Sequence, residues 1–150
     1  MKLSIIIPCY NEEEVLPLTL DRLKTLSQEW IAREDCNEVE FVIVDDGSQD
    51  RTSELLTESS KADKCVKVIR FSRNFGHQAA LLAGYEFAKG DVIVTLDADL
   101  QDPPELIGSM LDRIKEEYDI VYAARKSREI DSLFKRKTAD VFYWIMKKFG

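Results

Sequence analysis

The sequence predicts an α/β protein with a mostly parallel sheet and helices on both faces of that sheet. Short apolar runs rich in Ile and Val alternate with segments of helical periodicity along the chain, which is typical of strands joined by helical crossovers. The runs are continuously apolar, as expected of strands that are covered on both faces. A chain of 150 residues fits one domain, so we expect a single domain over residues 1–150.

The predicted elements follow one another as strand, helix and strand. We expect strands at residues 3–7, 41–44, 66–71, 92–96 and 120–123, and helices at residues 16–26, 54–60, 76–88, 103–114 and beyond 133. Pro17 suits the first turn of the first helix, where a missing N–H costs nothing. Asp50 or Thr52 is placed to cap the second helix. Gly90 ends the third helix, and the Pro-Pro pair at 103–104 opens the fourth.

The charge balance argues against nucleic-acid binding and indicates an anionic partner for the C-terminal segment. The formal net charge is -7, which argues against nucleic-acid binding, because duplex affinity comes mostly from Lys and Arg on phosphates. Residues 121–150 nevertheless carry eight Lys and Arg against three Asp and Glu. A basic tail on an acidic body indicates contact with an anionic partner, and the alternative is a solvated helix face.

The cysteines and the apolar segments indicate the compartment. Cys9, Cys36 and Cys65 are odd in number, widely spaced and without metal-ligand spacing, so we expect reduced thiols in a cytosolic setting. The apolar run at residues 5–7 is too short for a signal-peptide core. No run approaches the roughly 20 apolar residues of a membrane span.

Polar residues gather directly after three of the predicted strands. In a parallel sheet the carboxyl ends of the strands meet at one edge, where ligands bind. Packed carboxylates repel one another, so stability alone does not explain such a cluster. The polar residues at this edge are Asn11, Glu12, Asp45, Asp46, Asp97, Asp99 and Gln101.

Asp97 and Asp99 are predicted metal ligands. Alternate residues of an extended strand end point the same way, so both carboxylates are expected to face one side. Together with the side-chain oxygen of Gln101 they make an oxygen-only site suited to Mg²⁺ or Mn²⁺. A diphosphate would complete the coordination shell. The alternative is an Asx turn that precedes the helix at Pro103.

The chain lacks two common glycine-rich motifs that bind nucleotide phosphates. Neither GxGxxG nor GxxxxGK[ST] follows the first strand, so we expect neither a dinucleotide-binding loop nor a P-loop. We expect instead ring packing on Tyr10, contacts from carboxylates and a metal on the phosphates. Arg73 is placed to reach a phosphate or the base, or alternatively to pair with Asp46 or Asp97. His77 is expected at the rim of the cleft.

Several longer motifs occur in a fixed order along the chain. They are Ile5-Ile6-Ile7-Pro8-Cys9-Tyr10-Asn11-Glu12, Val44-Asp45-Asp46-Gly47-Ser48-Gln49-Asp50, Ser72-Arg73-Asn74-Phe75-Gly76, Asp97-Ala98-Asp99-Leu100-Gln101-Asp102-Pro103-Pro104-Glu105-Leu106, and Asp131-Ser132 followed by Lys135-Arg136. The first two, with Asp97-Ala98-Asp99, resemble the inverting glycosyltransferases of family 2, which have the Rossmann-like GT-A fold. The others are similar to the polyprenyl-phosphate branch of that family, which includes dolichol-phosphate mannose synthases and bactoprenol glucosyltransferases.

The resemblance implies a donor site at the ends of the first, second and fourth strands. Pro8, Tyr10 and Glu12 would line the base and ribose pocket. The candidate nucleotide-binding residues are Pro8, Tyr10, Glu12, Asp45, Asp46, Arg73 and Asp97, with Asp45 or Asp46 on the base. The candidate metal ligands, for Mg²⁺ or Mn²⁺ on the diphosphate, are Asp97, Asp99 and Gln101.

The resemblance also implies an acceptor side. The candidate catalytic residues are Asp99, Arg125, Lys135 and Arg136. The three basic residues would meet the phosphate of a lipid acceptor, which is already anionic and needs cations to position it rather than a strong base. Residues 133–149 combine apolar residues at near-helical spacing with basic residues, which predicts a helix lying in the membrane interface. The alternatives are a core-packing helix and a contact between subunits of a homo-oligomer.

The function that the resemblance implies is inverting transfer of a sugar from a UDP- or GDP-sugar to an acceptor, expected to be a polyprenyl phosphate, at the cytoplasmic face of the membrane. A divalent ion would stabilise the leaving diphosphate as a Lewis acid. One alternative is a non-catalytic nucleotide-binding fragment that needs a partner or a C-terminal region. Another is a sugar nucleotidyltransferase, but residues 8–12 lack the Gly-rich basic loop that it requires.

The chain departs from the family pattern in two places. Family members continue with more sequence than the 150 residues present here, so we expect a GT-A domain truncated at the C-terminus. His77 and Gln78 also stand where many relatives carry Lys and Glu, which bears on the start of the third helix.

Overall fold

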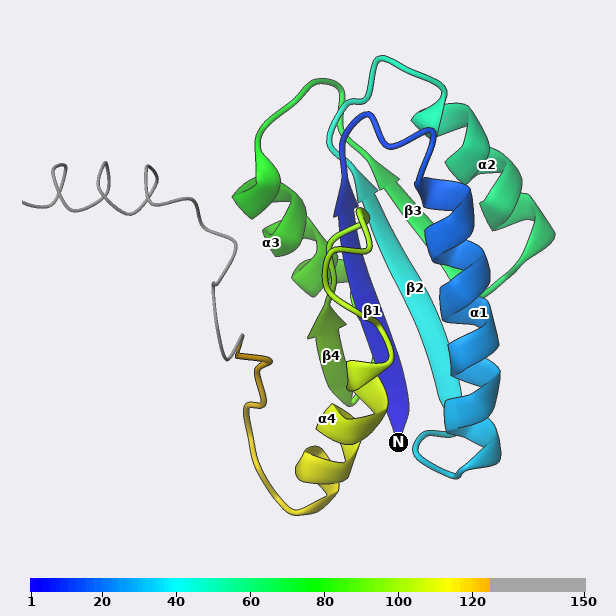
Figure 1. Ribbon diagram of the computed structural model, residues 1–150. Coiled ribbons are helices and arrows are strands. Elements are labelled where there is room, and N and C mark those ends of the chain that lie inside the picture. Colours follow the sequence, from blue (N-terminus) through cyan, green and yellow to red (C-terminus); the bar gives the residue numbers. More distant parts are fainter. Residues whose placement is uncertain (125–150) are drawn as a thin grey trace, which may run out of the picture.

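Figure 1 shows the computed structural model, in which residues 1–124 are described. Strands and helices alternate through this part of the chain, as the sequence predicts. The elements are β1 (Lys2–Cys9), α1 (Leu16–Ala32), β2 (Glu38–Asp45), α2 (Thr52–Ala62), β3 (Val66–Arg70), α3 (His77–Phe87), β4 (Val92–Thr95) and α4 (Leu106–Lys115). The candidate residues Arg125, Lys135 and Arg136 and the predicted helix at 133–149 lie outside the described residues.

The strands of the described residues form one parallel sheet in the order β3-β2-β1-β4. The register sets Ile5 of β1 between Phe41 of β2 and Val94 of β4. Since all strands run the same way, their carboxyl ends point toward one edge, the upper one in Figure 1. At that edge Cys9 of β1 is paired with Asp45 of β2.

Helices cover both faces of this sheet, which confirms the predicted α/β class. On one face α1, α2 and α4 join alternate residues of β1 and β2 in a single apolar cluster. On the other face α3 contacts β1 and β2. Gly84 permits this close approach, because a Cβ at that position would overlap the buried side chain of Ile6.

The longest helix also holds the loop that follows β4. Within α1, side chains at helical spacing are buried against the sheet, among them Leu16, Leu20 and Leu23, as expected of an amphipathic helix. Between them, the Thr19 hydroxyl donates a buried hydrogen bond to the carbonyl oxygen of Ala98, 2.7 Å away. The backbone between β4 and α4 is therefore fixed against α1.

A buried carboxylate crosslinks the sheet at the opposite end from the polar cluster. Glu40 accepts hydrogen bonds from the Ser4 hydroxyl at 2.6 Å and from the Lys89 backbone N–H at 2.7 Å. The Lys2 ammonium lies 3.2 Å from its other oxygen. Burial acts to raise the pKa of Glu40, but these partners outweigh it and lower the pKa below its ordinary value. Glu40 therefore stays ionised and ties β2 to β1 and to the turn before β4.

The prediction of a fifth strand at residues 120–123 is wrong. These residues follow α4 without strand pairing, and Ile120 and Tyr122 are 82% and 81% exposed. Their β-branched and aromatic composition favours a strand, but a strand needs a hydrogen-bonded neighbour. In the described part of the chain β4 pairs with β1 alone, so β4 is an edge. The other elements predicted between residues 1 and 124 are present and differ only at their ends, and the helix predicted beyond residue 133 lies outside the described residues.

The cysteines are unpaired, as predicted. Cys9 and Cys36 are buried, and Cys65 is exposed. Among the helices described between residues 1 and 124, none combines the length and the apolar character needed to cross a membrane.

Candidate functional site

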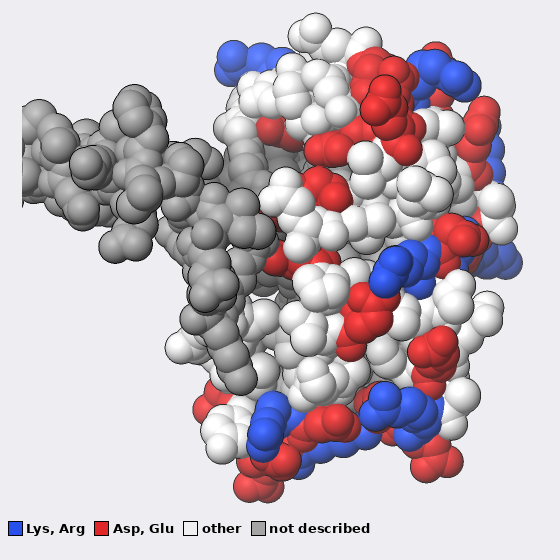
Figure 2. Space-filling view, in the orientation of Figure 1, with Lys and Arg blue, Asp and Glu red and all other residues white. Residues whose placement is uncertain are grey.

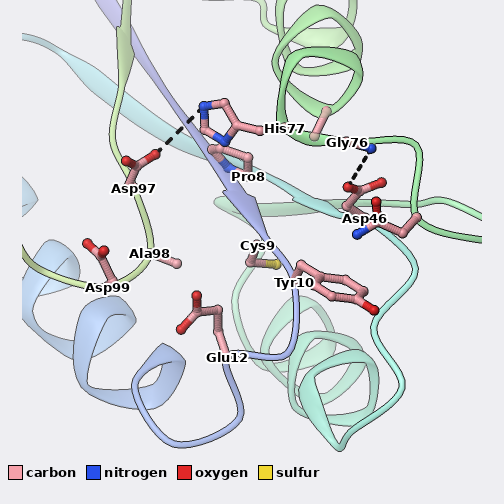
Figure 3. A pocket seen from close by; sticks show the side chains of 12 residues that line it. Pro8, Cys9, Tyr10, Glu12, Asp46, Gly76, His77, Asp97, Ala98 and Asp99 are labelled. Atoms are coloured by element: carbon pink, nitrogen blue, oxygen red, sulfur yellow. Dashed lines mark hydrogen bonds and ion pairs between the residues drawn. The ribbon is translucent and has the colours of Figure 1, made fainter. Parts of the chain in front are cut away.

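A cavity of about 440 Å³ opens at the carboxyl edge of the sheet. It lies where the ends of β1, β2 and β4 meet the start of α3, as Figure 3 shows. Figure 2 shows Asp and Glu side chains over the whole visible face, including the upper part, where the strands end in Figure 1. The residues that line the cavity are Pro8, Cys9, Tyr10, Glu12, Asp46, Asn74, Gly76, His77, Ala80, Asp97, Ala98 and Asp99.

Tyr10 and Glu12 form one side of the cavity, in the loop that follows β1. Tyr10 is 39% exposed, which leaves part of its ring free for stacking. Burial raises the pKa of Glu12, and the carboxylates of Asp99, Asp50 and Asp97 raise it further. A carboxyl pKa raised in this way indicates negative charge that nearby cations do not balance.

Asp46 joins the loop after β2 to the start of α3. Its carboxylate accepts hydrogen bonds from the backbone N–H groups of Phe75, at 2.7 Å, and Gly76, at 2.9 Å, and Figure 3 shows the second of these. The next residue, Gly47, has a φ of +72°, and a Cβ there would overlap the backbone of Arg73. The two loops are therefore in direct contact, and Asp46 faces the cavity between them.

Asp45, the neighbouring candidate, is not among the residues that line the cavity. Its side chain is fully buried and accepts hydrogen bonds from the Ser48 backbone N–H, at 2.9 Å, and from the Ser53 hydroxyl. The Arg70 guanidinium lies 3.8 Å from it. Asp45 therefore shapes the loop after β2, and Asp46 is the one of the two candidates that the structure places at the cavity.

Asp97 and Asp99 lie on the opposite side of the cavity from Tyr10, in the loop after β4. Gln101, the third predicted ligand, does not line the cavity. Its backbone N–H donates to Oδ1 of Asp99 at 2.9 Å, and Leu100 between them has a φ of +57°. The Asx turn considered from the sequence is thus formed, and it orients Asp99.

The donor atoms around Asp97 and Asp99 decide whether the predicted metal ion fits. Within residues 1–124, no group of three or more His, Cys, Asp or Glu side chains is arranged to hold a metal ion by itself. The two carboxylates of Asp97 and Asp99 do fit a divalent cation that also takes phosphate oxygens, because they are hard oxygen donors. After burial, the carboxylates of Asp99, Asp50 and Asp97 also raise the pKa of Glu12, so negative charge gathers at this part of the cavity.

The start of α3 adds two lining residues. His77 lies at the cavity with its Nε2 atom 4.0 Å from Oδ1 of Asp97. Asn74 also lines the cavity, and sequence reasoning missed it; the available signal was its place in the turn between a strand and a helix. Arg73 does not line the cavity, and its guanidinium stacks over the Phe75 ring at 4.6 Å from the centroid.

These features define an α/β protein with an acidic cavity at the carboxyl edge of a parallel sheet. The sequence of the chain matches Glycosyl transferase family 2 over residues 4–150. The chain therefore belongs to glycosyl transferase family 2, as its motifs predict.

Curated relatives agree with the predicted polyprenyl-phosphate branch. The uncharacterized glycosyltransferase YkcC of Bacillus subtilis is 48% identical, over 95% of this chain and 43% of its own length. An undecaprenyl-phosphate 4-deoxy-4-formamido-L-arabinose transferase of Pectobacterium carotovorum is 40% identical, over 97% and 43%. The prophage bactoprenol glucosyl transferase homolog of Escherichia coli is 37% identical, over 99% and 47%. The chain thus spans less than half the length of these relatives.

Solved structures agree with the fold. S. aureus TarS 1-349 in complex with UDP-GlcNAc is 28% identical, with a TM-score of 0.53, over 66% of this chain and 27% of that one. The mannosyltransferase PcManGT of Pyrobaculum calidifontis, in complex with GDP-Man and Mn2+, is 21% identical, with a TM-score of 0.57, over 75% and 31%. The GT-A-like fold predicted from the motifs is confirmed.

Proposed function

We propose that this chain forms the donor-binding part of a metal-dependent, inverting glycosyltransferase that moves a sugar from a nucleoside-diphosphate sugar to a polyprenyl phosphate. The observation that carries the proposal is the cavity, which sets an aromatic ring and a carboxylate pair on opposite sides. One side suits a base and the other a metal-bound diphosphate. The UDP-GlcNAc bound by TarS and the undecaprenyl-phosphate and bactoprenol relatives support the donor and acceptor classes.

The donor site is assigned residue by residue. Tyr10 packs against the base, and Pro8 and Glu12 line the base and ribose pocket. Asp46 is the base contact, because its two bonds to backbone N–H groups leave each oxygen a further lone pair. Arg73 remains a candidate for the phosphates only if it leaves its stacked position on Phe75.

Asp97 and Asp99 are the proposed ligands of Mg²⁺ or Mn²⁺. When bound, the ion offsets the negative charge that grows on the leaving diphosphate. Gln101 contributes by its backbone N–H, which holds Asp99, and this role replaces direct ligation in the proposal. Two protein carboxylates leave most of the coordination shell to phosphate oxygens and water.

The acceptor side of the proposal rests on residues outside the described part of the chain. Arg125, Lys135 and Arg136 are proposed to hold the acceptor phosphate. The basic and apolar residues at 133–149 are proposed to hold the cleft at the cytoplasmic face of a membrane. A contact between subunits through the same segment is the competing assignment.

Calorimetric titration with UDP and GDP, with and without Mn²⁺, tests the donor site. The wild type should bind one nucleoside diphosphate more tightly with Mn²⁺ than without it, and Asp99→Asn should lose that gain while keeping its melting temperature. Asp112→Asn, an exposed change on α4 away from the cavity, is the matched control and should bind as wild type does. An unchanged Mn²⁺-dependent gain in Asp99→Asn would refute the metal assignment.

A second candidate function is nucleotide binding without transfer. The cavity in the described residues is enough for it, since the proposed acceptor residues lie outside them. Transfer of labelled sugar from UDP- or GDP-sugars to undecaprenyl phosphate separates the two, since the proposed transferase forms a glycosyl lipid. Tight sugar-nucleotide binding with no lipid product, from the 150-residue chain, would favour the binding function.

A further inference from the structure

Two loops border the cavity and are hydrogen-bonded to each other. We call residues 10–15, after β1, the first loop, and residues 46–51, after β2, the second loop. Each loop offers backbone N–H groups to side-chain oxygens on the other side. The bonds between them, and to the first residue of α2, are Asn11 N to Ser48 Oγ (3.0 Å), Gln49 N to Asn11 Oδ1 (2.8 Å), Glu12 N to Thr52 Oγ1 (2.8 Å), Glu13 N to Asp50 Oδ2 (3.2 Å) and Arg51 N to Glu13 Oε2 (3.0 Å).

Asn11 takes part in this network in two ways at once. Its backbone N–H donates to Ser48, and its side-chain oxygen accepts from the N–H of Gln49. Its φ is +56°, a left-handed conformation that Asn and Asp tolerate better than other residues with a side chain. Glycine also adopts this conformation but has no acceptor. Only Asn and Asp therefore combine both properties at this position.

Asn11 lies between two residues that line the cavity, so the network can affect ligand binding. Its two neighbours, Tyr10 and Glu12, line the cavity, as does Asp46 of the second loop. Asn11, Ser48 and Gln49 are not among the lining residues. We propose that Asn11 is a positioning residue for nucleotide binding: it locks the first loop to the second, so that Tyr10 and Glu12 face the base and ribose before the ligand arrives. This inference rests on the proposed function, because it assigns a role within the same site.

The physical reason is pre-organisation. A loop that is already ordered pays no entropy for ordering when the ligand binds. Removing the Asn11 acceptor leaves the N–H of Gln49 without this partner and weakens the link between the two loops next to Tyr10, while the other four bonds remain. One hydrogen bond of ordinary strength corresponds to roughly a three- to tenfold change in affinity.

A series of substitutions at position 11 tests the role. Asn11→Asp keeps the acceptor and the left-handed preference, Asn11→Gly keeps only the backbone freedom, and Asn11→Ala keeps neither. The affinity for UDP or GDP with Mn²⁺, by calorimetry, should be near wild type for Asn11→Asp, roughly three- to tenfold weaker for Asn11→Gly, and weaker still for Asn11→Ala.

A control separates positioning from general stability. Asp63→Ala removes a side-chain acceptor for the backbone N–H of Cys65, 2.9 Å away. Asp63 lies between α2 and β3 and does not line the cavity. This variant should lower the melting temperature and leave nucleotide affinity unchanged, whereas Asn11→Gly should lower affinity at a temperature where it is fully folded.

The outcomes distinguish the inference from the proposed function. If the wild type binds a nucleotide and folded Asn11→Gly binds it equally well, the positioning role is overturned and the donor site stands. Failure of Asn11→Asp to recover the affinity lost in Asn11→Gly would overturn it as well. If the wild type binds no nucleoside diphosphate, the proposed function falls and the inference falls with it.

Discussion

Replacing Asp46 by Asn removes charge from a buried carboxylate without changing its shape. Asp46 is 4% exposed, and its oxygens accept the backbone N–H groups of Phe75 and Gly76 at 2.7 and 2.9 Å. An Asn amide has one acceptor, so one of the two bonds is lost, and its NH₂ group then faces an N–H donor. Hydrogen bonds to charged groups contribute about 1.5–3 kcal/mol each, so the free energy of unfolding should fall by about 2 kcal/mol.

Urea denaturation and calorimetry check this prediction. The urea midpoint of Asp46→Asn should fall with an unchanged slope, which marks a change in stability rather than in the denatured state. Its nucleotide affinity should also fall, with and without Mn²⁺, because the contact proposed for Asp46 is to the base and not to the phosphates.

Asp50→Asn is the matched control for this substitution. Asp50 also accepts two backbone N–H groups, from Thr52 at 2.9 Å and Glu13 at 3.2 Å, but it does not line the cavity. Because its bond to Glu13 belongs to the network between the two loops, Asp50→Asn should lose stability and some nucleotide affinity, but less affinity than Asp46→Asn does. Wild-type stability in Asp46→Asn, or equal losses of affinity in both variants, would refute the reasoning.

Three further predictions concern packing, pH and the membrane. Gly84→Ala should cost about 1–3 kcal/mol of unfolding free energy in urea titrations, because its Cβ overlaps Ile6 at the α3–β1 contact; wild-type stability would contradict this. Since the pKa of Glu12 is raised, Glu12 gains a proton as pH falls through that pKa, so Mn²⁺-dependent nucleotide affinity should weaken at acid pH, and less so in Glu12→Gln. Anionic liposomes should sediment the chain in a salt-sensitive way, whereas charge reversal by Glu at Lys135, Arg136, Lys147 and Lys148 should keep it in solution; a wild type that stays soluble at low salt would exclude the membrane role of 133–149.

The fold was predictable because its signals are local and mutually consistent. Strands such as Lys2–Cys9 and Glu38–Asp45 are buried along nearly their whole length, and a continuous apolar run is what burial on both faces requires. The same topology predicts that polar residues after β1, β2 and β4 meet at one edge. The prediction at residues 120–123 was wrong because strand propensity alone does not make a strand, and within residues 1–124 no strand pairs with this segment.

The site was predictable in its composition but not in its orientation. Asp45 and Asp46 are consecutive residues at a strand end, so their side chains point to opposite sides, and the sequence does not say which one faces the cavity. In the structure Asp45 accepts hydrogen bonds from Ser48 and Ser53, and Asp46 lines the cavity. Gln101 was likewise predicted as a side-chain ligand, whereas its described contact with Asp99 is made by its backbone.

The charges at the cavity constrain how a nucleotide binds there. Among the described lining residues, Glu12, Asp46, Asp97 and Asp99 are acidic, none is Lys or Arg, and His77 is the one group able to become cationic. A diphosphate brought into this cavity alone would be repelled, because like charges a few ångströms apart interact by about 1 kcal/mol or more even in water. Asp46 accepts hydrogen bonds from two backbone N–H groups, which offset its charge. Asp99 accepts only one, from Gln101, and Asp97 lies 4.0 Å from Nε2 of His77. On the proposed function, the base contact can therefore act without a metal, whereas the diphosphate should bind far better together with the divalent ion.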